Sequence, residues 1–378
     1  MTPLPSSAVP RRTLLTIGAM GLAGCTGSDL DPGTAVSQPP ADAARWRMPD
    51  EAERHTRTWM ALGASEEIWG EDLVDEVWEN LADIAAAIVA FEPVSILVRP
   101  EEVDDARDLL DRRITIVPVG MDDLWIRDSG PVFTTDGTTL RGVDFNFNGW
   151  GDKQEHAADA LVARGVLRSS ATPRRATELV LEGGAIEVDG LGTALITRSC
   201  VLNDNRNPGW SQQEVEAELE TLLGIRRVIW LPGIAGRDIT DGHTDFYARF
   251  AGPGVILAAL DDDPQSYDHE VTREHLGILR ATRQADGTPY EVVTLTAPRD
   301  IREDFLSDDF AAGYLNFYVC NGGVVMPQFG DKRADRTALQ TLRKAFPGRE
   351  VVQVAIDGIA AGGGGIHCAT QQQPAPTA

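Results

Sequence analysis

Apolar residues recur at helical spacing in several separate stretches of the chain. Side chains three or four positions apart share one face of a helix, so this spacing predicts amphipathic helices. Ser211-Gln212-Gln213-Glu214 reads as a capping box for one of them, and Gly224 marks its end. The predicted helices cover about 72–90, 155–164, 211–223, 268–284 and 332–346.

Short extended runs follow four of these helices. They read PVSILV, RRVIWLP, YEVVTLTAP and REVVQVAID. The last three are spaced by roughly 60 residues, which indicates a repeated supersecondary unit rather than a literal sequence repeat. If such units are arranged around an axis, we expect the loops at their strand ends to meet in one place.

Unusual polar residues recur in those loops. The segments are WIRDSGP, LEGGA, TDGHTD and the C-terminal GGGGIHC. Loops held on a rigid scaffold commonly carry binding and catalytic residues. The pattern therefore predicts one site built from several distant segments.

Composition limits the classes of function. The 378 residues are 42% hydrophobic and 24% charged, which is typical of a soluble globular protein. The net charge of −24 argues against a nucleic-acid partner, because phosphate binding needs a basic surface. An acidic field favours cationic ligands, although it also serves solubility alone.

The N-terminus resembles an export signal. Arg11-Arg12 precedes an apolar run that ends at Ala23 and is too short to span a bilayer. Paired arginines suggest twin-arginine export, and Leu22–Cys25 (LAGC) resembles a bacterial lipobox. We predict a lipoprotein signal peptide at 1–25, lipidation of Cys25 and a flexible tether at 26–45, with the protein anchored at the outer face of the bacterial membrane. The alternative is an ordinary secretory signal with an incidental cysteine.

Three further cysteines lie in the expected folded part. Cys200 and Cys320 sit among apolar neighbours and are predicted to be inert core residues. Cys368 instead follows four glycines and His367. In an extended strand, His367 would point to the face opposite Cys368.

The TDGHTD segment offers an imidazole between carboxylates. In a strand, His243 and Asp245 would share a face, and Asp241 would join them only if the strand began early. A metal site here is a weak reading, because zinc usually takes more nitrogen or sulfur ligands. Trp125 and Trp59 either wall a narrow slot or pack in the core.

Asp128 and Glu182 complete the candidate set. Each is followed within two residues by glycine, so a ligand could approach closely, although a turn or cap role is the simpler reading for either acid alone. A thiol with a histidine suggests a nucleophile and a general acid/base. Several carboxylates oppose oxyanion stabilisation in a peptidase, but they suit a planar guanidinium.

Together, GGGGIHC, TDGHTD, WIRDSGP and LEGG resemble motifs of the agmatine deiminase and Porphyromonas-type peptidyl-arginine deiminase family, in the guanidino-group-modifying superfamily. MPDEAERHTRTWMALG, VLNDNRNPGW and YLNFYVCNGGVVMPQFG add to the resemblance, which covers about residues 46–374 as one catalytic domain. The resemblance implies an α/β fold, a five-bladed α/β propeller (the pentein fold) of pseudo-symmetric ββαβ units.

The resemblance also implies the chemistry. Cys368 is expected to be the nucleophile and His243 the general acid/base, with Glu182 orienting the histidine or the guanidinium. The expected substrate-binding residues are Asp128, Asp245, Trp125 and, with less support, Asn316. The implied enzyme is a hydrolase of C–N bonds in linear amidines that converts agmatine to N-carbamoylputrescine and ammonia through a thiouronium intermediate on cysteine, without a metal or organic cofactor.

Other functions remain open from the sequence. A peptidyl-arginine or free-arginine deiminase would form citrulline and, for a free carboxylate, would need a group such as Arg198, Arg206 or Arg249. An amidinotransferase would replace water with an amine. A non-catalytic lipoprotein that binds guanidines or polyamines would need no thiol. Expected partners are a guanidinium small molecule or an arginyl peptide, with membrane contact only through the lipid anchor and no prediction of oligomeric state.

Overall fold

The computed structural model describes residues 46–302 and 309–376. The predicted signal peptide, tether and lipidated Cys25 lie outside these residues. None of the helices in the described ranges is both long and apolar enough to cross a membrane.

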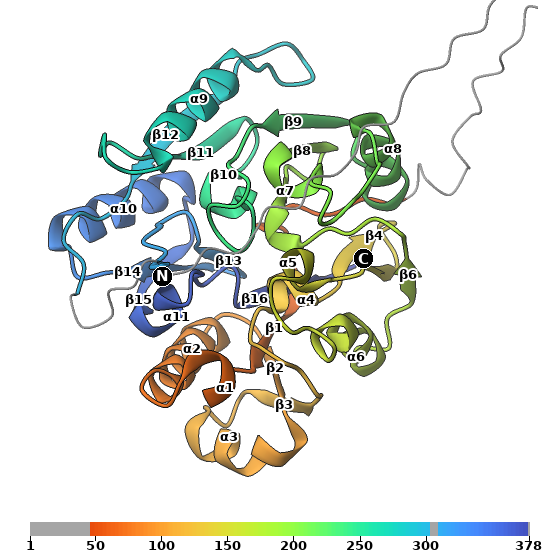
Figure 1. Ribbon diagram of the computed structural model, residues 1–378, viewed down its shortest axis with the longest axis vertical. Helices are drawn as coiled ribbons and strands as arrows, with labels where there is room; N and C mark the ends of the chain where they lie inside the picture. The colour runs from red at the N-terminus through yellow and green to blue at the C-terminus, as the bar shows by residue number, and fades with distance from the viewer. Residues whose placement is uncertain (1–45, 303–308, 377–378) are drawn as a thin grey trace, which may run out of the picture. The chain divides into compact units, whose positions relative to one another are not determined.

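The described strands form five small sheets, which Figure 1 shows arranged around a common centre. Four of the sheets have three strands each, in the same order: an antiparallel pair, then a third strand parallel to the second. A helix connects the second strand to the third, as a parallel crossover requires. The strands are β4 (Val132–Thr135), β5 (Leu140–Asp144) and β6 (Arg174–Ala176); β7 (Ile186–Val188), β8 (Thr193–Thr197) and β9 (Arg227–Leu231); β10 (Ala248–Phe250), β11 (Val255–Leu260) and β12 (Glu291–Thr296); and β13 (Tyr318–Cys320), β14 (Gly323–Gln328) and β15 (Glu350–Ala355).

The fifth sheet joins the two ends of the described chain. Its order is β16 (Thr370–Pro374), β1 (His55–Leu62), β2 (Val94–Val98) and β3 (Thr115–Pro118). β16 pairs antiparallel with β1, so the last strand supplies the first position of the first blade. The result is the expected five-bladed α/β propeller of ββαβ units, with one extra strand.

Each predicted extended run contains the parallel third strand of a blade, namely β2, β9, β12 or β15. The crossover helices are α2 (Val74–Val89), α6 (Val162–Ser169), α8 (Gln212–Leu223), α9 (Asp268–Ala281) and α10 (Lys332–Ala345), and α3 (Val103–Leu109) precedes β3. Ser211 and Glu214 form the predicted capping box, and Gly224 ends α8 in the left-handed conformation at φ 70°. The helix predicted at 155–164 was placed too early.

That displaced helix has a local cause. The carboxylate of Asp122 accepts hydrogen bonds from the backbone N–H groups of Ala158 (2.7 Å) and Asp159 (3.0 Å), so helical structure starts there. A short 3₁₀ turn, η2 (Asp159–Leu161), leads into α6. The remaining short helices are η1 (Pro100–Glu102), α1 (Glu66–Trp69), α4 (Ile126–Ser129), α5 (Gly149–Asp152), η3 (Gly183–Ala185), α7 (Arg198–Val201), η4 (Thr244–Phe246) and α11 (Asp357–Ala361).

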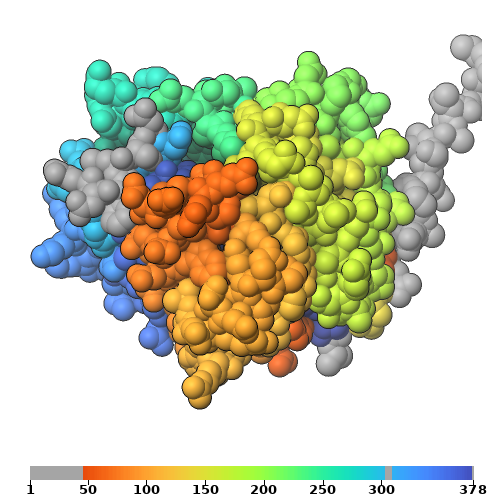
Figure 2. Space-filling view, turned by 60° about the horizontal axis from the view of Figure 1, so that its bottom comes forward, coloured from red at the N-terminus to blue at the C-terminus, as the bar shows by residue number. Residues whose placement is uncertain are grey.

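Neighbouring blades share apolar cores. Trp59 and Leu97 of the first blade pack in one buried cluster with Phe133 of the second blade and Leu167 of α6. Figure 2 shows the segments around α3 and α6 side by side on this face. Packing of this kind holds the blades in fixed relation, so the loops at their inner ends have defined positions.

Candidate active site

Four segments bring the predicted chemistry together, and their positions follow from the blades. Asp128 lies in α4 and Glu182 directly precedes η3. His243 precedes η4, which contains Asp245, and Cys368 lies two residues before β16. All five side chains are buried, and the most exposed of them retain only 5% of their accessible surface.

Asn316 fixes the position of the Cys368 thiol. Its side-chain Nδ2 donates to Cys368 Sγ at 3.3 Å, and its Oδ1 accepts from the backbone N–H groups of His367 (2.9 Å) and Cys368 (3.3 Å). The thiol also lies 3.7 Å from Asp245 Oδ2. Burial and the charges of Asp245 and Asp128 raise the pKa of Cys368 well above the ordinary thiol value.

The glycines before the thiol permit close packing. A Cβ atom on Gly364 would lie 2.2 Å from the ring of Trp125, and one on Gly365 would lie 2.5 Å from Asn316 Oδ1. Neither contact is sterically possible, so both positions exclude larger residues. Trp125 therefore packs against the nucleophile segment, with its ring centroid 5.7 Å from that of Trp69.

Gly184 has no side chain at the centre of the site, and we call the position that its Cβ atom would occupy the hollow. A Cβ atom there would lie 2.6 Å from His243 Nδ1, 3.0 Å from Asp128 Oδ1 and 3.1 Å from Asp245 Oδ2. Its backbone N–H donates to Asp128 Oδ1 at 3.1 Å, and Trp150 Nε1 donates to Asp128 Oδ2 at 3.0 Å. One point in space is thus faced by an imidazole and two carboxylates.

His243 is buried between acids without a hydrogen-bond partner on either ring nitrogen. Nδ1 lies 3.8 Å from Asp128 Oδ2, and Nε2 lies 3.6 Å from Glu182 Oε2. Burial opposes protonation, but the charge of Asp128 and the contacts with Cys200 and Glu182 prevail and raise the pKa of His243 well above its ordinary value. His243 is therefore protonated at neutral pH and can act as an acid.

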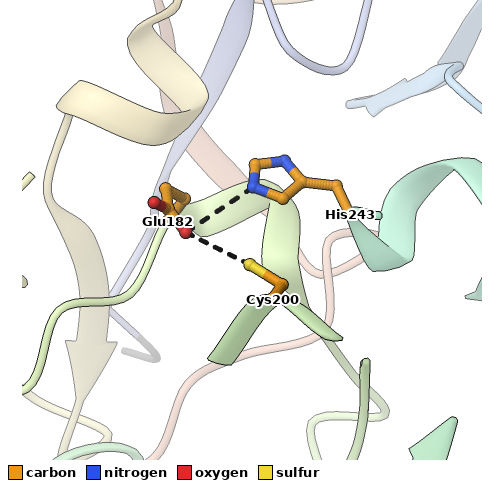
Figure 3. A group of neighbouring side chains, drawn as sticks. All are labelled: Glu182, Cys200 and His243. Carbon is orange, nitrogen blue, oxygen red and sulfur yellow. Dashed lines mark hydrogen bonds and ion pairs between the residues drawn. The ribbon is translucent and has the colours of Figure 1, made fainter. Parts of the chain in front are cut away.

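Glu182 is held from behind by Arg206, whose Nε donates to Oε1 at 2.9 Å. Burial alone would raise the pKa of Glu182, but its interactions with His243 and Arg206 lower it to about 2. Cys200 Sγ lies 3.4 Å from Oε2, on the side where His243 also approaches (Figure 3). Cys200 is buried as expected, but it contacts the site and is not an isolated core thiol.

One local expectation was wrong, and two alternatives left open by the sequence are resolved. His243 and Asp245 do not lie in a strand, because a 3₁₀ turn begins at Thr244, yet both still face the hollow. Asp241 turns away and binds Arg206 at 2.5 Å, so it does not join His243 in a metal site. Trp59 lies in the apolar cluster between blades, with its Nε1 donating to Gln373, and does not wall a slot with Trp125.

His367 also differs from expectation. Residues 366–369 form a turn rather than a strand, and His367 reaches the same carboxylate as the thiol. Its Nδ1 lies 2.7 Å from Asp245 Oδ2 and its Nε2 lies 2.9 Å from Glu51 Oε2. Both ring nitrogens lie within hydrogen-bond distance of a carboxylate, so His367 bridges Asp245 and Glu51.

The three arginines considered for carboxylate recognition are already engaged. Arg206 binds Glu182 and Asp241, and Arg249 binds Glu51 at 2.8 Å as well as Glu187. Arg198 lies over the ring of Trp230 and donates to Gln212.

Sequence reasoning missed the supporting residues, which are Trp150, Arg206, His367 and Glu51. Trp150 has a local signal, because it lies in the FNFNGWGD segment between polar and glycine residues. It adopts φ 56°, an uncommon conformation for a bulky residue, and this directs its indole to Asp128. The supporting roles of Arg206, His367 and Glu51 depend on contacts between blades.

Comparisons with known proteins identify the family. The sequence model of the Porphyromonas-type peptidyl-arginine deiminase family matches residues 47–374. The chain is 38% identical to the agmatine deiminase of Stutzerimonas stutzeri, over 91% of this chain and 99% of the relative, and 36% identical to that of Medicago truncatula, over 87% and 96%.

Solved structures confirm the fold. The agmatine deiminase of Enterococcus faecalis superposes with a TM-score of 0.82 at 32% identity, covering 90% of this chain and 98% of that one. The chain therefore belongs to the Porphyromonas-type peptidyl-arginine deiminase family.

Proposed function

We propose that the protein hydrolyses agmatine to N-carbamoylputrescine and ammonia, acting on the C–N bond of the guanidinium group. The observation that carries this proposal is the hollow at Gly184, which is faced by His243, Asp128 and Asp245, with the Cys368 thiol 3.7 Å from Asp245. The agmatine deiminases similar to this chain over most of its length support the same reaction.

The carboxylates of Asp128 and Asp245 bind the guanidinium. This group is planar, permanently charged and rich in N–H donors, so two carboxylates can grip it through paired charge-assisted hydrogen bonds. Trp150 and Gly184 donate to Asp128, and His367 donates to Asp245, which holds both acids in orientation. The positive charge of the bound guanidinium offsets the free-energy cost of burying the two carboxylates.

The reaction then proceeds in two halves. The bound cation lowers the pKa of Cys368, the thiol proton passes to solvent, and the thiolate adds to the central carbon. Protonated His243 donates to one amino group, ammonia leaves, and a thiouronium cation remains. Neutral His243 next takes a proton from water, and the hydroxide adds to the same carbon. Collapse then releases the thiolate and the ureido product, whose hydroxyl proton passes to solvent. Glu182 stabilises the charged form of His243.

Agmatine is favoured over arginine by the engagement of the candidate arginines. Free arginine presents a carboxylate that would need a cationic partner, but Arg206 and Arg249 are buried in ion pairs with protein acids. Arg198, the third candidate, lies against Trp230 at the surface. Agmatine has no carboxylate and places no such demand on the site.

A substrate panel tests the assignment. The protein is incubated separately with agmatine, arginine and an arginyl peptide, and ureido product and ammonia are both quantified. We expect the highest kcat/KM for agmatine, with one ammonia per ureido group. A higher kcat/KM for arginine or the peptide would contradict the substrate assignment, and binding of agmatine without product would favour the non-catalytic alternative.

We also propose export with a lipid anchor on Cys25. The paired arginines, the short apolar run and the LAGC segment support it. Metabolic labelling with a fatty-acid analogue should mark the wild-type protein and not Cys25→Ser. Equal labelling of both, or none in either, would contradict lipidation at this residue.

A further inference from the structure

We propose that Glu182, Cys200 and His243 form a binding site for a thiophilic divalent cation, represented by Zn²⁺, and that its occupancy inhibits the enzyme. The inhibition, though not the site, rests on the proposed deiminase function. Figure 3 shows the three side chains, which come from different segments and point toward one another. They meet on the Nε2 side of His243, whereas Nδ1 faces the hollow.

The ligand spacing fits a tetrahedral metal. With a Zn–S bond of about 2.3 Å and Zn–N or Zn–O bonds of about 2.0 Å, neighbouring ligand atoms of a tetrahedron lie about 3.3–3.5 Å apart. Cys200 Sγ lies 3.4 Å from Glu182 Oε2, and His243 Nε2 lies 3.6 Å from the same oxygen. One ligand atom from each of the three residues lies within 4.8 Å of the others. Little movement is therefore needed to surround an ion.

Two further features distinguish this group from an accidental cluster. His243 Nε2 is buried and has no hydrogen-bond partner, although it faces the carboxylate. Arg206 donates to Glu182 Oε1 and leaves Oε2 for the metal, as an outer hydrogen bond commonly fixes a metal-binding carboxylate. A sulfur, a nitrogen and a carboxylate oxygen are ligands that zinc accepts in sites with one open position.

The charges of the proposed ligands balance the charge of the metal ion. Zn²⁺ binding releases the thiol proton of Cys200 and the proton on His243 Nε2, so one thiolate and one carboxylate neutralise the ion. Arg206 remains paired with Asp241 at 2.5 Å.

Inhibition follows from the two nitrogens of one ring. Nδ1 faces the hollow and Nε2 faces the proposed metal site. With Zn²⁺ on Nε2, the imidazolium needed to protonate the departing amino group cannot form. The ion also repels the guanidinium held by Asp128 and Asp245, so agmatine and Zn²⁺ should weaken each other's binding reciprocally.

Direct binding provides the test. The wild type and its variants are stripped with a chelator, and Zn²⁺ affinity is measured by competition with a chromophoric chelator. Cys200→Ser and Cys200→Ala are compared with Cys320→Ser, which alters another fully buried thiol, and with Cys368→Ser. Co²⁺ loading supplies a second readout, because thiolate ligation gives a charge-transfer band.

We expect one tight Zn²⁺ site in the wild type, Cys320→Ser and Cys368→Ser, and an affinity at least about tenfold weaker in both Cys200 variants, since losing even an outer-shell partner has that effect. Among the variants, the Co²⁺–thiolate band should be lost only in those in which Cys200 is replaced. Equal affinity in the Cys200 variants, loss of binding in Cys368→Ser, or no site in the wild type would overturn the proposal.

Activity is measured separately. The Zn²⁺ concentration for half-inhibition, taken relative to each variant's own metal-free rate, should rise at least about tenfold in a Cys200 variant. Unchanged inhibition there, alongside weakened Zn²⁺ binding, would overturn the inhibitory role. A wild type without deiminase activity would overturn the proposed function, whereas the binding comparison would still decide the metal site.

Discussion

Cys368 Sγ lies 3.7 Å from Asp245 Oδ2, so the nucleophile of the proposed reaction is placed directly beside an acid that binds the substrate. In the empty site this arrangement disfavours the thiolate, because burial and then the charges of Asp245 and Asp128 raise the pKa of Cys368. A bound guanidinium offsets part of this negative charge and so lowers the pKa of Cys368. We therefore expect the substrate to activate the nucleophile.

Alkylation rates test this activation. At neutral pH, a cationic haloacetamidine should modify Cys368 faster than a neutral haloacetamide, after correction for their rates with a free thiol. Lowering the pKa by one unit gives about ten times more thiolate, so we expect a selectivity of at least about tenfold. The modified residue is identified by peptide mass spectrometry.

The pH dependence of Cys368 alkylation provides a second measurement in the same experiment. Because the pKa of Cys368 is raised, its alkylation by the neutral reagent should keep increasing above pH 9, where an ordinary thiol levels off. Equal corrected rates for both reagents, with a plateau near pH 9, would be incompatible with substrate activation.

Gly184→Ala should block the hollow. Its Cβ would lie 2.6 Å from His243 Nδ1 and near both guanidinium-binding acids, so the added methyl should displace these side chains. We expect kcat/KM for agmatine to fall at least about 100-fold, because displacements of about 1 Å are that costly. Overpacking should cost about 1–3 kcal/mol of unfolding free energy.

Gly277→Ala is the matched control. Gly277 lies in α9, and its added Cβ would meet no atom within 4 Å. This variant should keep full activity and gain about 0.5–1 kcal/mol of stability. Wild-type kinetics in Gly184→Ala would show that the hollow is not where substrate binds.

His367→Gln should weaken substrate binding in a pH-dependent way. Burial raises the pKa of Asp245, but His367 outweighs this effect and keeps the pKa below its usual value. Without His367 the pKa of Asp245 rises, so a larger fraction of Asp245 is protonated at a given pH. Loss of one charge-assisted hydrogen bond, about 1.5–3 kcal/mol, should raise KM for agmatine about 10–100-fold.

The direction in which KM changes with pH distinguishes an electrostatic role of His367 from a structural one. Raising the pH deprotonates Asp245 again, so KM of His367→Gln should fall toward the wild-type value as pH rises, while wild-type KM changes less. Thermal melting at each pH monitors folding. A KM defect that does not vary with pH would refute the electrostatic role of His367.

Local patterns predicted most of the crossover helices and the third strands of four blades, β2, β9, β12 and β15. Both are long enough to show apolar periodicity, and the Ser211 capping box fixes one helix start through neighbouring residues. The first strands of several blades are too short for this, such as Ala248–Phe250 and Tyr318–Cys320. Closure of the ring by β16 requires contact between the two ends of the described chain, which no local pattern records.

The site shows the same difference between features with a local sequence pattern and features that depend on contacts between distant segments. The acids, the histidine and the thiol could be found because glycine-rich segments isolate them from apolar runs. The ion pair of Arg206 with Glu182, and the bridge that His367 makes from Asp245 to Glu51, depend on which loops meet. Expecting a strand at His367 gave the wrong side-chain direction, because a turn precedes β16.

The most direct test of the account is agmatine turnover by Cys368→Ser beside the wild type and Cys320→Ser, a matched change of a buried thiol outside the site. We predict equimolar N-carbamoylputrescine and ammonia from the wild type and from Cys320→Ser, and no turnover by Cys368→Ser. Substantial ureido product from Cys368→Ser would contradict the account.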